Sequence, residues 1–120
     1  KQVMLSFRDS GKKEAVKLTD ITKKVPQSLE EIQKNLFTKA KAFLDSTIKK
    51  PKTMEELETA VNNNKTVFVP FCNKEFCEQK TKEKFGIKSL NAPLNQKDVK
   101  EKCIFCGEKA EKMFYFGKSY

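Results

Sequence analysis

The sequence predicts an α+β fold, a two-layer sandwich in which helices cover one face of a small mixed sheet. From about residue 47, strand-like and helix-like patterns follow one another in the order β-α-β-α-β-β. The strand-like run Thr66–Phe71 is rich in β-branched and aromatic residues, and the helix-like segments carry their own start and stop signals. A sheet covered by two helices satisfies this order. A strand and a long helix are expected to precede this unit.

The first residues predict a strand, a turn and a returning strand. Val3–Phe7 is an apolar run, and both of its faces are expected to be at least partly covered. Arg8–Gly11 follows as a turn, because the glycine allows the backbone conformation that a tight turn needs. Glu14–Leu18 then alternates between polar and apolar residues, which indicates a strand that runs back along the first.

A long amphipathic helix comes next. Ser28 is its predicted N-cap, because Glu31 stands three residues later, as in a capping box. The helix is expected to end at Asp45–Ser46. Its apolar residues recur at intervals of three and four, and lysines occupy the opposite side, so the apolar stripe is predicted to face a core. The stripe consists of Leu29, Ile32, Leu36, Phe37, Ala40, Phe43 and Leu44.

The second unit begins with a short predicted strand, Thr47–Lys49. Thr53 and Glu56 form another capping-box pattern, which opens a helix that the asparagines at 62–64 end. The remaining predicted elements are the strand Thr66–Phe71, a helix over about residues 74–84 stopped by Gly86, a strand Ile87–Leu94, a charged loop over residues 95–102 and a final strand Met113–Phe116.

The charge of the chain favours a partner that contains RNA or DNA. The net charge is +9 and the pI is about 9.4. All 25 basic residues except Arg8 are Lys, and they are spread along the chain, so a solvated Lys-rich surface explains the charge equally well. Sequence-specific readout relies on Arg and is therefore not expected.

The sequence argues against an independent enzyme and against a membrane protein. It has no His, no Gly-rich phosphate loop and no nucleophile motif. No apolar run approaches the roughly 20 residues that span a bilayer, and no signal peptide is recognisable, so we expect a cytoplasmic protein with no membrane contact. Because the chain lacks an initial Met, we expect it to be the C-terminal fragment of a longer protein that ends at Tyr120.

The four cysteines are arranged as two close pairs. Cys72 and Cys77 are separated by four residues, and Cys103 and Cys106 by two. This spacing is typical of four thiolates around one structural zinc ion, with no open coordination position. Two disulfides, an iron–sulfur cluster and free thiols are the alternatives at this stage.

Several segments together resemble one enzyme family over nearly the whole chain. V-P-F-C-N-K-E-F-C-E, C-I-F-C-G-E-K-A and the ending M-F-Y-F-G-K-S-Y resemble the C-terminal region of archaeal/eukaryotic-type prolyl-tRNA synthetases. The upstream segments R-D-S-G-K-K, E-E-I-Q-K-N-L-F-T-K-A and T-M-E-E-L are similar to the end of the anticodon-binding domain of the same family and its junction.

The resemblance implies that the parent is a class II ligase that activates proline with ATP and attaches it to tRNA(Pro). Residues 1–46 would then be the end of the anticodon-binding domain, and residues 47–120 a zinc-binding C-terminal domain. The catalytic domain, with its ATP, Mg and proline sites, would lie upstream of Lys1, and the parent would be a homodimer. The fragment alone would be inactive. The zinc ligands of the family carry over onto Cys72, Cys77, Cys103 and Cys106.

Two further sets of residues receive a role through the resemblance. Arg8, Lys12 and Lys13 around the first turn are the candidates for tRNA contact, although solvated turn residues explain them equally well. Tyr120 is expected to contact the catalytic domain. Tyr115 and Phe116 could stack on bases, but a final strand more often contributes its aromatic residues to the core. The alternative function is a free-standing zinc-binding RNA-interaction module.

Overall fold

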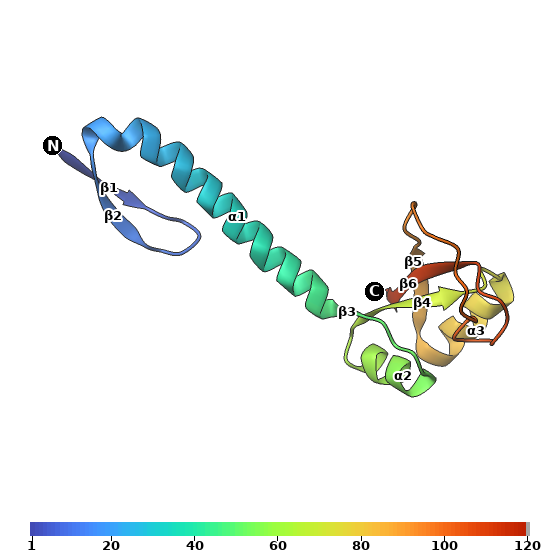
Figure 1. Ribbon diagram of the computed structural model, residues 1–120. Coiled ribbons are helices and arrows are strands. Elements are labelled where there is room, and N and C mark those ends of the chain that lie inside the picture. Colours follow the sequence, from blue (N-terminus) through green and yellow to red (C-terminus); the bar gives the residue numbers. More distant parts are fainter. Residues whose placement is uncertain (120) are drawn as a thin grey trace. The chain divides into compact units, whose positions relative to one another are not determined.

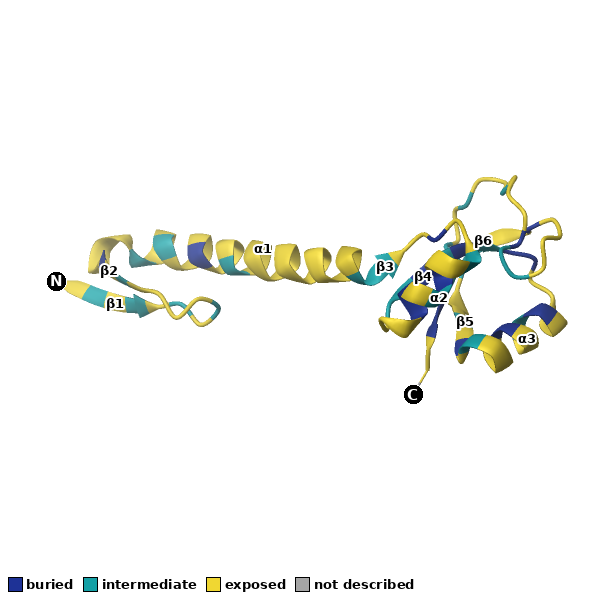
Figure 2. Cartoon of the chain, turned by 90° about the horizontal axis from the view of Figure 1, so that it is seen from below, coloured by how far each residue is buried: buried dark blue, intermediate teal, exposed yellow. Residues whose placement is uncertain are grey.

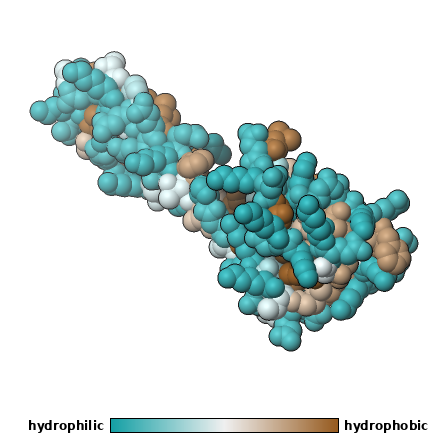
Figure 3. All heavy atoms as spheres, turned by 45° about the vertical axis from the view of Figure 1, so that its right-hand side comes forward, coloured by the Kyte–Doolittle hydropathy of each residue, from teal (hydrophilic) through white to brown (hydrophobic). Residues whose placement is uncertain are grey.

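The computed structural model describes residues 1–119, so the contact predicted for Tyr120 lies outside the described residues. Within them the chain forms two compact units, the first over Lys1–Asp45 and the second from Ser46 onward (Figure 1). No helix among the described residues is both long enough and apolar enough to cross a membrane. The molecular surface is mainly hydrophilic in the view of Figure 3.

The first unit starts with a β-hairpin, as predicted. Strand β1 (Gln2–Ser6) pairs antiparallel with β2 (Lys13–Lys17), and Val3 lies opposite Val16. The turn between them is closed by two backbone hydrogen bonds of 2.8 Å, from the Phe7 N–H to the Lys12 carbonyl and from the Gly11 N–H to the Phe7 carbonyl. Gly11 has a positive φ of 69°, a backbone conformation that glycine adopts easily. This agrees with the turn predicted at this glycine.

Helix α1 (Ile21–Thr47) begins earlier than predicted, directly after a 3₁₀ turn at Leu18–Asp20. Ser28 is a buried residue inside the helix, so its assignment as the N-cap was wrong. Pro26 also lies inside the helix. Proline has no N–H and so cannot make one of the intrahelical hydrogen bonds, yet the helix continues through it.

Much of the apolar stripe of α1 is exposed. Four of its large side chains are between 51% and 64% exposed, and most of α1 is exposed in Figure 2. These four are Leu29, Leu36, Phe37 and Leu44, whereas Ile32 is partly buried. The described residues therefore do not form the core that this stripe was predicted to face, and exposed apolar side chains on one helix face mark a contact surface.

The second unit is built on a four-stranded mixed sheet. Its strand order is β3 (Ile48–Lys49), β4 (Thr66–Phe71), β6 (Lys112–Lys118) and β5 (Ile87–Asn91). Strands β3 and β4 are parallel, and the other two pairs are antiparallel. Strand β5 ends before the predicted Leu94, after an irregularity in its pairing between Ser89 and Asn91.

Two helices pack on one face of this sheet. In α2 (Met54–Asn62) the Thr53 hydroxyl accepts a hydrogen bond of 3.3 Å from the Glu56 N–H, which is the predicted cap. Helix α3 (Glu75–Phe85) ends at Gly86, which adopts a left-handed conformation with φ of 66°. One core cluster contains residues of both helices and alternate residues of β4. The predicted α+β class and mixed sheet are confirmed.

Candidate metal centre

The four cysteines come from three places in the second unit. Cys72 directly follows β4, and Cys77 lies in the first turn of α3. Cys103 and Cys106 lie in the connection between β5 and β6. Asn73, between the first two elements, has a φ of 56°, which lets the chain turn sharply from the end of β4 into α3. Two segments distant in the sequence thus meet at one point.

A tight turn holds the second cysteine pair. The Cys103 N–H donates to the Glu108 carbonyl at 2.7 Å, and the Gly107 N–H donates to the Cys103 carbonyl at 2.8 Å. Gly107 has a φ of 75°, so the glycine after Cys106 supplies the backbone freedom that this turn needs. The turn itself thus has a defined backbone conformation, although it belongs to no helix or strand.

Backbone hydrogen bonds also join this turn to the end of β4. The Ile104 N–H donates to the Pro70 carbonyl at 3.2 Å, and the Glu111 N–H donates to the Phe71 carbonyl at 2.8 Å. The side chains of Lys74 and Glu108 add an exposed ion pair between the two halves of the site. The cysteine pairs are therefore close together in the protein fold itself.

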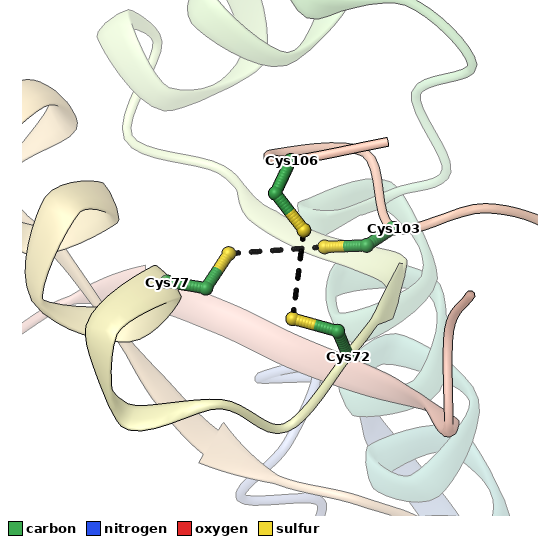
Figure 4. A group of neighbouring side chains, drawn as sticks. All are labelled: Cys72, Cys77, Cys103 and Cys106. Carbon is green, nitrogen blue, oxygen red and sulfur yellow. Dashed lines mark hydrogen bonds between the residues drawn. The ribbon is translucent and has the colours of Figure 1, made fainter. Parts of the chain in front are cut away.

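The four sulfur atoms have the spacing of a tetrahedral metal site. All lie within 4.8 Å of one another. The Sγ atoms of Cys77 and Cys103 are 3.9 Å apart, and those of Cys72 and Cys106 are 3.6 Å apart (Figure 4). Four sulfurs at about 2.3 Å from one zinc ion would be about 3.8 Å from each other, so the donor set fits a single ion.

The same sulfur–sulfur distances argue against disulfides and against an iron–sulfur cluster. A disulfide requires an S–S distance of about 2.05 Å, and all four cysteines are free thiols in the structure. An iron–sulfur cluster places several iron and sulfide ions between its cysteines, and sulfurs this close leave no room for them. The four cysteines can therefore hold one metal ion.

Burial makes the uncharged thiols the stable form of part of this cluster. Cys72, Cys77 and Cys103 are buried, and Cys106 is exposed. Burial raises the pKa of the Cys77 thiol, and the neighbouring Cys103 raises it further. Burial also opposes ionisation of Cys103, but hydrogen bonds from the backbone N–H groups of Cys106 and Phe105 lower its pKa. A cation among the sulfurs would favour the thiolate form of all four.

The residues predicted to contact tRNA lie in the first unit. Arg8, Lys12 and Lys13 are exposed residues of the β1–β2 hairpin, so they are close together along one turn, and they are not part of the cysteine site. Their assignment to tRNA contact stays a prediction. The Lys74–Glu108 pair was missed, since a pair 34 residues apart has no signal in the local sequence.

Comparisons with known proteins give one consistent result. The sequence model of the family described as "Prolyl-tRNA synthetase, C-terminal" matches residues 54–120, which include all four cysteines. Proline–tRNA ligase 2 of Bacillus cereus is 39% identical over 121 aligned residues, and the alignment covers 99% of this chain. The proline–tRNA ligase of Nanoarchaeum equitans is 34% identical over 114 residues, which cover 94% of the chain.

A solved structure extends the similarity to the fold. The crystal structure of prolyl-tRNA synthetase from Cryptosporidium parvum, complexed with halofuginone and AMPPNP, matches 99% of this chain with a TM-score of 0.90 and 32% sequence identity. The chain spans about a quarter of the length of these relatives, namely 25% of the Bacillus ligase, 21% of the Nanoarchaeum ligase and 26% of the Cryptosporidium chain.

Proposed function

Because this chain belongs to the prolyl-tRNA synthetase C-terminal family, we propose that the protein that carries it is a proline–tRNA ligase. Such a class II enzyme activates proline with ATP and attaches it to tRNA(Pro). The observation that carries the proposal is the family match over residues 54–120, supported by ligases that align with nearly the whole chain. The chain has no catalytic motif of its own, so its role is a supporting one.

The proposal assigns residues 1–46 to the end of an anticodon-binding domain and residues 47–120 to a C-terminal domain. The exposed part of the α1 stripe supports the first assignment, since Leu29, Leu36 and Phe37 are more than half exposed and form an apolar surface suited to packing against further protein. The relatives are about four times as long as this chain, and the same extra length in the parent would supply that surface. Its remaining parts would bind proline, ATP and Mg.

Zinc is the ion that we assign to the four cysteines. Its preference for four thiolates in a closed tetrahedron fits sulfurs 3.6 and 3.9 Å apart. With all four positions taken by protein, the ion has a structural role. The residues that hold it connect the end of β4, the start of α3 and the turn that leads into β6. The zinc site thereby positions the last strand of the domain.

Two contacts of the parent enzyme are proposed from the family resemblance. Arg8, Lys12 and Lys13 would contact tRNA(Pro), for which their exposure and positive charge on one hairpin are suitable. Tyr120, outside the described residues, would contact the catalytic domain. A cytoplasmic homodimer is the proposed form of the parent.

Aminoacylation tests the proposed function. We expect the full-length protein to attach radiolabelled proline to tRNA(Pro) in an ATP-dependent reaction, and not to charge the same tRNA with aspartate. The 120-residue chain alone should be inactive, because its sequence has no adenylation motif. A full-length protein that charges no tRNA with proline, or a fragment that does so alone, would contradict the proposal.

The alternative, a free-standing RNA-interaction module, is favoured only by the net charge of +9. It predicts micromolar binding of tRNA by the 120-residue chain, with an affinity that falls steeply between 50 and 200 mM salt, on the order of the loss typical of phosphate contacts. The ligase proposal predicts only weak binding by this chain. A titration at low and high salt distinguishes the two.

A further inference from the structure

The sheet of the second unit has an open face opposite its helices. Residues alternate between the two faces of a strand, and Val67 and Phe116 lie opposite each other on the core side. Their neighbours Phe68 and Tyr115 therefore point to the other side. Both are half-buried, and their rings stack with centroids 4.3 Å apart and an angle of 29° between the planes. An aromatic pair thus stands on a sheet face that neither helix covers.

A cavity of about 490 Å³ adjoins this pair. Its apolar lining residues include Phe68, Pro70, Ile104 and Met113. Its charged lining residues are Lys50, Lys52, Lys102 and a single acid, Glu101. The Lys50 ammonium lies 5.7 Å from the centroid of the Phe68 ring, so a positive charge stands directly beside the aromatic surface. The volume suits one nucleotide, since small-molecule sites measure about 300–1,000 Å³.

A second cavity, beside helix α2, adjoins the first. It measures about 570 Å³ and shares Lys50 and Pro51 with the first. It adds two further lysines, Lys49 and Lys65, and one acid, Glu56. The Glu56 carboxylate accepts a hydrogen bond of 2.8 Å from the backbone N–H of Lys52. This hydrogen bond partly compensates the negative charge of Glu56. Lysines thus exceed acids along both cavities, and the surface attracts a chain of negative charges.

We propose that this face binds an unpaired segment of RNA, with a base against Phe68 and Met113 and the adjoining phosphates near Lys50, Lys52 and Lys102. Aromatic side chains that stack on bases beside a positive groove are the usual means of binding a single strand. Lysine binds phosphate as a point charge without reading the base edge, so the site accepts different bases. The inference rests on the proposed function, which supplies an RNA partner.

Two other occupants fit these features less well. A free nucleoside triphosphate is normally held by a Gly-rich loop of backbone N–H groups, and the sequence has none. The carboxylates of an acidic protein segment would pair with the lysines, but they would make no stacking contact with the Phe68–Tyr115 pair. Two adjoining cavities that share Lys50 and Pro51 suit a ligand that continues beyond one unit, as a strand does.

An NMR titration of the zinc-loaded 120-residue chain with a short oligouridylate tests the site. We expect weak, saturable binding, with chemical-shift changes concentrated at Lys50, Phe68 and Met113. Phe68→Leu removes the ring but keeps an apolar side chain, and Lys50→Gln removes the charge. Each should raise Kd by about fivefold or more, the effect of losing one stacking contact or one well-placed phosphate contact. The matched control Lys82→Gln, at an exposed position of α3, should raise it by less than about twofold.

Three results would overturn the site. Equal effects of Lys50→Gln and Lys82→Gln, or equal affinity for an RNA duplex of the same length, would show attraction by charge alone. Equal affinity for uridine monophosphate would assign the cavity to a free nucleotide, and displacement of the RNA by a poly-glutamate peptide at equal concentration would assign it to an acidic protein segment. None of these results affects the aminoacylation test, so a failure here is distinguishable from a failure of the proposed function.

Discussion

The substitution Cys103→Ser is expected to abolish zinc binding and to lower the melting temperature of the second unit in the same step. Cys103 is 2% exposed, and its backbone closes the turn that precedes β6 through hydrogen bonds with Glu108 and Gly107. A hydroxyl is a poor zinc ligand, and the remaining three thiols cannot close the tetrahedron. Because metal binding energy in small zinc modules is folding energy, on the order of 10 kcal/mol, the loss should exceed that of any single core substitution. Metal analysis and calorimetry measure both effects.

A chelator provides the control for this prediction. If the loss of zinc causes the lower melting temperature, the wild-type chain stripped of metal should melt at nearly the same temperature as the Cys103→Ser variant. Hydrogen exchange should then locate the change. The amides of Ile104, Gly107 and Glu111 bond across or within the site, so they should lose protection first, while the β1–β2 hairpin stays unchanged. Equal zinc content and equal melting of wild type and variant would refute the account of the site.

The second large effect is expected from Phe71→Ala. This side chain is 1% exposed and ends β4 next to Cys72. Its ring makes edge-on contacts with Phe105, Phe114 and Phe116, at centroid distances of 6.0, 5.4 and 5.0 Å. Removal of a buried phenyl ring leaves a cavity and typically costs about 3–5 kcal/mol of unfolding free energy. Denaturant unfolding of the zinc-loaded chain measures this cost.

The chain contains a matched control for this substitution. Phe76 is separated from Phe71 by only four residues, yet its side chain is 69% exposed on α3. Phe76→Ala should therefore change the unfolding free energy by at most about 0.5 kcal/mol. Similar losses for the two variants would mean that Phe71 is not the centre of the core described for the second unit.

The elements that could be predicted from the sequence are those with strong local signals. The Thr53–Glu56 cap, the glycine stop at Gly86 and the β-rich run Thr66–Phe71 all appear in the structure as predicted. Each depends on a few neighbouring residues whose backbone preferences agree. The cysteine pairs are similar, because their spacing indicated that the four side chains would come together, and the structure places the sulfur atoms within 4.8 Å of one another. The ion between them stays a proposal.

Other features depend on contacts that local patterns do not contain. The start of α1 was misplaced because Ser28 and Glu31 imitate a cap inside a helix that continues through Pro26. The stripe of α1 was correctly identified as apolar, but Leu29, Leu36 and Phe37 are more than half exposed, so the described residues do not form the core that it was predicted to face. The open sheet face escaped notice because it arises only when Phe68 and Tyr115, far apart in the sequence, pair across β4 and β6.

X-ray absorption at the zinc edge, on protein purified without added metal, tests most directly the proposal that the four cysteines hold one structural zinc ion. We expect one zinc per chain with four sulfur neighbours at about 2.3 Å and no nitrogen or oxygen neighbour. Fewer sulfur neighbours, iron in place of zinc, or folded protein that is purified without any bound metal before chelator is added would contradict the proposal.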